Sequence, residues 1–124
     1  MSNLIRIHIF VEGQTEETFV QEVLYSPFLE IGILLNPILL STGRTGKGGV
    51  TSYKQVQKQI ERKCKEDPDA IVTTMLDLYG LPTDFPGYSD SIGILDPYDK
   101  VRFLEKSWKD ESQQKKIYPL SFLT

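Results

Sequence analysis

The fold of this chain is decided near its start, by the stretch LIRIHIFVEGQT at residues 4–15. Its first eight residues are nearly all apolar, as in a strand that is buried on both faces of a parallel sheet covered by helices. The apolar run stops at Glu12-Gly13, and a helical pattern follows, with its apolar face at Phe19, Val20, Val23, Leu24 and Phe28. A strand followed at once by a helix is the opening of a βαβ unit, so we expect an α/β fold. We expect Thr15 to cap this helix.

The rest of the chain continues the alternation of strands and helices. A second, short strand is expected at residues 37–40, and a third strand at residues 70–76 delivers Asp77 at its C-terminal end. A second helix between them carries an apolar face made of Tyr53, Val56, Ile60 and Cys64 and ends before Pro68. Residues 79–94 are loop-like, and Asp96-Pro97 starts a third helix. Right-handed crossovers make the sheet parallel, so the sequence predicts a three-layer α/β/α domain with a small, mostly parallel sheet.

Composition limits what the protein can be. A length of 124 residues corresponds to one domain. No apolar stretch is long enough to span a bilayer, and the first residues lack the pattern of a signal peptide, so we expect no membrane association. The one cysteine, Cys64, has no partner for an internal disulfide, which favours a cytoplasmic location. A net charge of −3 argues against a broadly basic nucleic-acid binder, but it leaves room for a nuclease that holds phosphate through metal ions.

Two acidic residues follow two of the predicted strands. Glu12 comes directly after the first strand and Asp77 after the third. Because ligands of open parallel sheets bind beyond the carboxyl ends of the strands, we expect both carboxylates at the same edge. Such a pair suits Mg²⁺, which commonly takes one or two carboxylates and several waters and can activate a phosphodiester. The alternative is that these are two solvated acids at strand ends.

Other polar segments favour structural roles. The glycine-rich basic loop at residues 42–49 lacks the P-loop pattern, because Gly48 follows Lys47. Asp84 is an alternative source of a further metal oxygen, although turn formation is the more ordinary role of an aspartate between prolines. The basic stripe of Lys54, Lys58 and Arg62 is typical of a solvated helix face.

Three further side chains are expected to serve packing. His8 is the only histidine and lies inside the first strand, where packing or exposure at a sheet edge is more ordinary than catalysis. Cys64 falls on an apolar helix face, which predicts a buried and unreactive thiol. Trp108 is expected to anchor the core.

Residues 11–16, VEGQTE, resemble the opening motif of Toprim domains, the module of topoisomerases, primases and related nucleases. Together with TTMLDLYGLP at residues 73–82 and Phe85-Pro86-Gly87, they are similar to a bacterial Toprim-like family, domain of unknown function family 4276. The resemblance extends to about Lys116, so we expect residues 1–116 to form a Toprim-like α/β domain. Some members are encoded near ATPases in apparent defence loci, which implies an ATPase partner and, from the Toprim likeness, a nucleic-acid substrate.

The resemblance also implies roles for individual residues. Toprim enzymes use the glutamate that Glu12 matches as a general acid or base. They hold Mg²⁺ with an Asp-x-Asp pair, of which Asp77 matches the first member. Tyr79 stands in the place of the second aspartate, which leaves one carboxylate fewer for the metal.

The end of the chain departs from the family pattern. Family members continue with a further strand and a segment rich in histidine and glutamate. With one permissible choice of codons, deleting a single adenine from the run that encodes Lys115 and Lys116 produces a frame that resembles this continuation. We therefore expect residues 117–124 to be an irregular, frameshifted tail on a truncated member of the family. The coding DNA tests this expectation.

The leading hypothesis is a Mg²⁺-dependent nuclease or phosphoryl-transfer domain in which Glu12 transfers a proton or positions the metal and Asp77 is a metal ligand. The alternative is a non-catalytic interaction module or an inactive, truncated relic. A receiver-like α/β domain is a third hypothesis, but that fold requires two acids after the first strand, where this chain has Glu12 followed by glycine.

Overall fold

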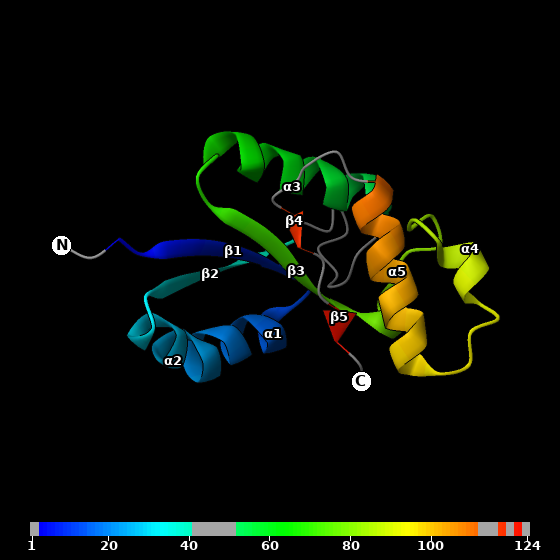
Figure 1. Ribbon diagram of the computed structural model, residues 1–124, viewed down its shortest axis with the longest axis horizontal. Coiled ribbons are helices and arrows are strands. Elements are labelled where there is room, and N and C mark those ends of the chain that lie inside the picture. The colour runs from blue at the N-terminus through cyan, green and yellow to red at the C-terminus, as the bar shows by residue number, and fades with distance from the viewer. Residues whose placement is uncertain (1–2, 41–51, 112–116, 119–120, 123–124) are drawn as a thin grey trace.

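The computed structural model describes residues 3–40, 52–111, 117–118 and 121–122 of the chain. Its sheet is built from three seven-residue strands, β1 (Ile5–Val11), β2 (Ile33–Leu39) and β3 (Ile71–Asp77). The central strand, β1, pairs in parallel with both of the others (Figure 1). The prediction of a small α/β fold with a parallel sheet is therefore confirmed.

The register of the strands decides which residues meet at the carboxyl edge of the sheet. Val11, the last residue of β1, lies opposite Leu39 of β2 and Met75 of β3. Because β3 continues for two residues beyond Met75, its last residue lies beside the chain that leaves β1. The segment that follows Val11 is thereby placed next to Asp77.

One face of the sheet is covered by the first helical segment, which runs through α1 (Gln14–Phe19), a π-helical turn η1 (Val20–Leu24) and α2 (Tyr25–Glu30) (Figure 1). The prediction that Thr15 caps this helix is wrong. Extended Gly13 occupies the N-cap position instead, and Thr15 lies within the first turn. The π turn directly precedes the part of α2 that contains Pro27. A proline ring crowds the preceding turn and lacks an N–H, so a wider turn accommodates it there.

The other face is covered by α3 (Tyr53–Glu66) and α5 (Pro97–Glu111), as Figure 1 shows. Ser52 caps α3, since its hydroxyl accepts a hydrogen bond from the N–H of Gln55 at 3.3 Å. The predicted start of the third helix is also confirmed, because the Asp96 carboxylate accepts from the N–H of Tyr98 at 2.9 Å. The segment expected to be a loop contains two short elements, the 3-10 turn η2 (Leu78–Gly80) and α4 (Tyr88–Ser91).

A hydrophobic core lies on each side of the sheet. The smaller one joins the first helical segment to the strands and includes Ile9, Val11, Val20, Leu35 and Met75. The larger one joins the strands to α3, α5 and the segment before α4, and includes Phe10, Ile60, Cys64, Val72, Leu76 and Trp108. Burial of Cys64 and Trp108 confirms the packing roles expected for them. Trp108 meets the rings of Phe85 and Tyr53 edge to face, with centroid distances of 5.0 and 6.4 Å.

Strand β2 is longer than the sequence pattern indicated, because it begins at Ile33 rather than at Pro37. It is an edge strand, and an edge position tolerates a proline that cannot donate to a neighbouring strand. On the other side of the sheet, two-residue strands β4 (Ile117–Tyr118) and β5 (Ser121–Phe122) pair in parallel with β3. They belong to the segment for which an irregular tail was expected, and the residues between and after them lie outside the described part of the chain. None of the helices in the described ranges has the length and apolar character that crossing a membrane requires.

Candidate strand-end carboxylate site

The structure brings Glu12 and Asp77 together at the carboxyl edge of the sheet. Glu12 is the first residue after β1 and Asp77 is the last residue of β3. The backbone N–H of Asp77 donates a hydrogen bond to Oε1 of Glu12 at 2.5 Å. This bond fixes one carboxylate oxygen of Glu12 against the end of the neighbouring strand, so the expected proximity of the two acids is found.

Gly80 closes this site from the side of η2. A Cβ atom built on Gly80 lies 3.4 Å from Oε2 of Glu12 and 3.9 Å from Cγ of Asp77. Both carboxyl groups therefore lie within 4 Å of one point, and a Cβ atom at this position would be in ordinary van der Waals contact with both. The sequence analysis did not single out Gly80. The only feature of the sequence that could have indicated Gly80 is its position, three residues after the strand-end Asp77.

The surroundings of Glu12 favour its protonated form. The pKa of Glu12 is raised to about 7, chiefly because its side chain is partly buried; the hydrogen bond from the Asp77 N–H opposes this rise, and the nearby negative charges of Asp77 and Glu16 add to it. Near neutral pH this carboxyl exchanges its proton readily. Such a group can act as an acid or a base, and a cation bound beside it would stabilise its ionised form.

The donor set fits Mg²⁺ only in part. Two carboxylates with water ligands are an ordinary protein contribution to a Mg²⁺ site. Within residues 3–40, 52–111 and the two short C-terminal strands, no group of three or more His, Cys, Asp or Glu residues is arranged to hold a metal ion. The backbone of Tyr79, in the place of the second Toprim aspartate, lies in η2, and its side chain is outside the described part of the structure. A metal here would be held by Glu12, Asp77 and water.

Asp84 does not join these acids in the structure. Its Oδ1 accepts a hydrogen bond from the N–H of Tyr53 at 2.9 Å, at the first residue of α3. An acceptor at a helix N-terminus satisfies an otherwise unpaired donor and faces the positive end of the helix dipole. The Asp84 side chain therefore ties the segment before α4 to α3, which is a structural role other than the turn formation expected for it.

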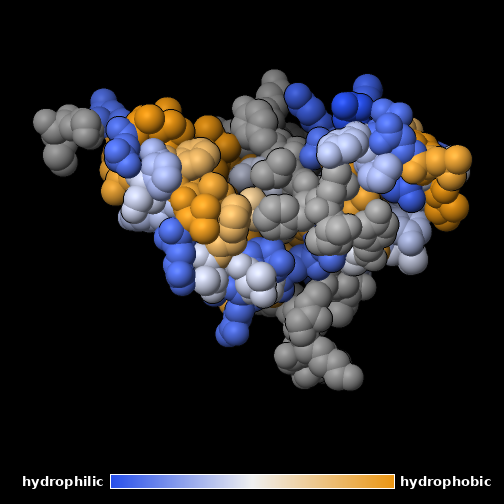
Figure 2. Space-filling model, turned by 90° about the horizontal axis from the view of Figure 1, so that it is seen from below, coloured by the Kyte–Doolittle hydropathy of each residue, from blue (hydrophilic) through white to orange (hydrophobic). Residues whose placement is uncertain are grey.

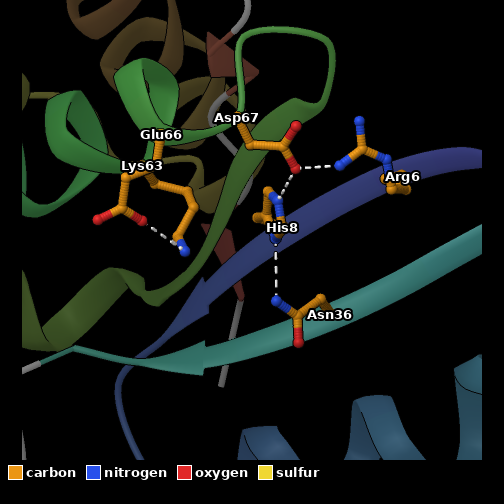
Figure 3. Close-up of polar contacts among 6 residues, drawn as sticks. All are labelled: Arg6, His8, Asn36, Lys63, Glu66 and Asp67. Atoms are coloured by element: carbon orange, nitrogen blue, oxygen red, sulfur yellow. Dashed lines mark hydrogen bonds and ion pairs between the residues drawn. The ribbon is translucent and has the colours of Figure 1, made fainter.

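His8 lies in a separate polar network on β1, well before the carboxyl end of that strand (Figure 3). Its Nε2 is 2.9 Å from Oδ2 of Asp67, and its Nδ1 is 2.9 Å from Nδ2 of Asn36. Arg6 also donates to Oδ2 of Asp67. The hydrogen bond from His8 and then the contacts of Arg6 lower the pKa of Asp67. With both ring nitrogens engaged, His8 links β1 to β2 and to the end of α3.

The remaining polar candidates stay apart from the carboxylates. Lys54, Lys58 and Arg62 are exposed along α3, as a solvated face requires. A shallow hollow beside them is lined by acidic as well as basic side chains, among them Glu61 and Glu66. The basic loop at residues 42–49 lies outside the described residues.

Comparison with known proteins gives one match. A family model described as a domain of unknown function, DUF4276, matches residues 11–123 and so includes both strand-end acids. No curated protein matches, and no solved structure matches.

Proposed function

This chain belongs to the DUF4276 family, and from that membership and the paired carboxylates we propose that it is a Toprim-like domain for Mg²⁺-dependent phosphoryl transfer of the nuclease type. The observation that carries the proposal is the contact of Glu12 with Asp77 at the carboxyl edge of a parallel sheet. Ligands of such sheets bind at this edge. The likeness of residues 11–16 to the Toprim opening motif supports the same assignment.

Each acid has a separate role in this proposal. Asp77 is a metal ligand, and Glu12 combines metal positioning with proton transfer. When bound, Mg²⁺ supplies positive charge that polarises a phosphodiester. The pKa of about 7 lets Glu12 accept or donate a proton at neutral pH, and the hydrogen bond from the Asp77 N–H keeps its carboxyl aimed at the strand end. Gly80 leaves room beside both groups.

Metal binding tests the proposal without depending on activity. We expect calorimetric titration with Mg²⁺ or Mn²⁺ to show binding to the wild-type chain, with proton release because a cation favours ionised Glu12. The Glu12→Gln/Asp77→Asn variant loses binding at least tenfold. The matched control is Asp99→Asn/Asp110→Asn, which removes two exposed carboxylates that form surface ion pairs with Arg102 and Lys106, and this control is expected to keep the wild-type affinity. A folded wild type that binds neither metal, or equal binding by the strand-end variant, contradicts the proposal.

Activity is the second stage of the test. Labelled single-stranded DNA, double-stranded DNA and RNA are incubated with the chain and Mg²⁺ or Mn²⁺, and cleavage is followed on denaturing gels. General acid–base catalysis contributes roughly 10²–10⁴-fold to a rate, so Glu12→Gln is expected to slow cleavage by about that factor. Cleavage that survives this substitution unchanged comes from another site or from a contaminant.

One observation favours a second function, that of a non-catalytic interaction module. Tyr79 replaces the second aspartate of the Toprim pattern, and within the described residues the site has two carboxylates rather than three. In this alternative the domain serves a partner protein, for which an ATPase is our candidate. Metal binding without cleavage of any substrate, together with specific binding of an ATPase, favours the module over the enzyme.

A further inference from the structure

The connection between α4 and α5 presents large apolar side chains to solvent. The exposed fractions are 66% for Ile92, 93% for Leu95 and 65% for Tyr98. Figure 2 shows an apolar patch at the right-hand end of the molecule, where Figure 1 places α4 and its connection to α5. Single exposed apolar residues are ordinary, whereas a contiguous apolar patch is typical of an interaction site, and these three side chains fall within seven consecutive residues. We call residues 92–98 the apolar tip.

A small cavity opens beside the apolar tip. Its volume is about 110 Å³, and Ile92 of the tip forms part of its wall. The other lining residues come from η2, α4, α5 and the segment after η2, and are Leu78, Leu81, Tyr88, Ser91, Lys100 and Leu104. Ligand pockets for drug-sized molecules usually have roughly 300–1,000 Å³. This cavity therefore suits a single inserted side chain, which is the arrangement found at the centre of protein interfaces.

The charge around the apolar tip is acidic. Between Lys65 and Lys100 the sequence contains no Lys, Arg or His. Asp96 lies within the tip and Asp90 lies two residues before it, and both are exposed. The Asp96 carboxylate also accepts from the N–H of Tyr98, and Asp99 forms an ion pair with Arg102 at 2.9 Å. Because the charges of this ion pair cancel, the two negative charges of Asp90 and Asp96 exceed the one positive charge of Lys100, which lines the cavity.

We propose that the apolar tip and its cavity form a docking surface for a basic, amphipathic segment of a partner protein. One apolar side chain of the partner fills the cavity, others cover Leu95 and Tyr98, and its Lys or Arg residues face Asp90 and Asp96. A second copy of this chain fits less well, because a symmetric contact brings the same aspartates face to face. The proposal goes beyond the phosphoryl-transfer function and does not depend on Glu12 or Asp77.

The test uses designed peptides on the full chain. The probe is a helical peptide of roughly 15 residues with Leu along one face and Lys elsewhere. Two control peptides each keep one of these properties. A Leu/Glu peptide keeps the apolar face but has the opposite charge, and a Ser/Lys peptide keeps the positive charge but lacks the apolar face. Amide chemical shifts of the labelled chain report the binding site and the affinity. We expect the Leu/Lys peptide to shift residues 88–104 and to bind at least tenfold more tightly than either control.

Protein variants distinguish specific binding at the apolar tip from non-specific hydrophobic binding elsewhere on the chain. Ile92→Ser/Leu95→Ser is expected to weaken binding of the Leu/Lys peptide at least tenfold. The matched control is Ile31→Ser, because Ile31 is 72% exposed in the turn after α2, away from the tip. That variant keeps its affinity within twofold. Raising the salt concentration weakens binding, since the aspartates are exposed.

Three results overturn the proposal. The first is binding that the Ile92→Ser/Leu95→Ser variant retains while its amide spectrum shows a folded protein. The second is equal binding of the Leu/Glu peptide, which removes the basic partner from the inference. The third is a wild-type dimer, seen by light scattering, that the same double substitution dissolves, which makes a second copy the occupant.

Discussion

At the scale of single residues, Glu12 illustrates how position sets the chemistry of a carboxyl group. Its folded-state pKa of about 7 lies above the ordinary value of 4.5 because the side chain is partly buried and faces other acids. Between these two pH values the folded protein holds a proton that the unfolded chain has lost. The stability that protonated Glu12 contributes is therefore fully present below about pH 4.5 and is lost as the pH rises toward 7.

Replacing Glu12 by Gln is expected to remove this pH dependence. Glutamine keeps the oxygen that accepts from the Asp77 N–H but has no charge to bury. Relative to wild type, Glu12→Gln gains about 1 kcal/mol of unfolding free energy between pH 4.5 and 8, once the solvent exposure of the carboxyl is taken into account. Urea unfolding in EDTA at both pH values measures this gain. Parallel pH profiles of the two proteins would show that Glu12 titrates normally.

Gly87 is the residue whose backbone most clearly requires glycine. Its φ is +82°, and a Cβ atom there lies 2.5 Å from Oγ of Ser107 and 3.2 Å from a ring carbon of Phe103. We expect Gly87→Ala to lower the unfolding free energy by about 2–4 kcal/mol, from left-handed backbone strain and from the collision with α5. Gly93→Ala is the control, since a Cβ at Gly93 meets no atom within 4 Å and its φ is not positive. Its expected effect is below about 0.5 kcal/mol. Thermal unfolding compares the two, and equal losses would contradict the argument.

At the scale of elements, Asp67 joins helix α3 to the strands. It stands at the C-cap of α3, and its carboxylate contacts Arg6 and His8 of β1 (Figure 3). Its pKa is lowered, so the stability from these contacts is present above its ordinary value of 3.8 and is lost as the pH falls through the lowered value.

The Asp67→Asn variant is therefore expected to unfold at a lower urea concentration than wild type at pH 7. The difference between the two midpoints begins to shrink as the pH falls below 3.8, where the unfolded chain becomes protonated, and it is lost once the pH is below the lowered pKa of folded Asp67. Asp110→Asn, which affects only an exposed pair with Lys106, is the control and leaves the midpoint nearly unchanged. A midpoint difference for Asp67→Asn that is the same at pH 7 and pH 3 would mean that packing, not charge, is what the substitution removes.

The elements also show how far sequence patterns lead. The apolar pattern of the sequence was sufficient to predict β1, α3 and β3, and the Asp96-Pro97 cap was sufficient to predict the start of α5. The apolar pattern failed where local chemistry competes with it. Thr15 has the composition of a helix cap, but Gly13 supplies the extended residue one step before the helix starts. The π turn η1 is a response of the backbone to Pro27, and periodicity at 3.6 residues per turn does not contain it.

For the candidate site, the sequence predicted the edge of the sheet but not its surroundings. The proximity of Glu12 and Asp77 follows from parallel strand order alone. Gly80 could not be predicted, because it depends on how η2 folds back over the strand ends. The helix-capping contact of Asp84 with α3 is equally a product of tertiary structure, since it joins residues 31 positions apart.

At the scale of the whole molecule, the buried side chains form two separate hydrophobic clusters, one on each side of the sheet. Val20 belongs to the core under the first helical segment, and Ile60 to the core under α3, and both side chains are fully buried. Substitutions in separate cores act independently when they share no neighbours, whereas substitutions in one core couple through the packing that they share.

We therefore expect the effects of Val20→Ala and Ile60→Val to add. Single losses of about 2 and about 1 kcal/mol are typical of such truncations, and their sum should hold within about 0.5 kcal/mol in the double variant. The comparison pair is Ile60→Val with Val72→Ala, both in the larger core, for which a departure from additivity is expected. Urea unfolding of all variants under one set of conditions measures both couplings. Strong coupling between Val20 and Ile60 would show that the sheet transmits strain from one face to the other.

The division into two cores gives the chain a one-sided optical reporter. Trp108 is the only tryptophan, and it lies in the larger core against Phe85 and Tyr53. Emission excited at wavelengths selective for indole thus follows the side of the sheet that carries α3 and α5. Far-ultraviolet circular dichroism follows helices on both sides. Ellipticity that fades in denaturant before the indole emission shifts would reveal that the layer of α1 and α2 melts first, while coincident curves would mark the domain as a single cooperative unit.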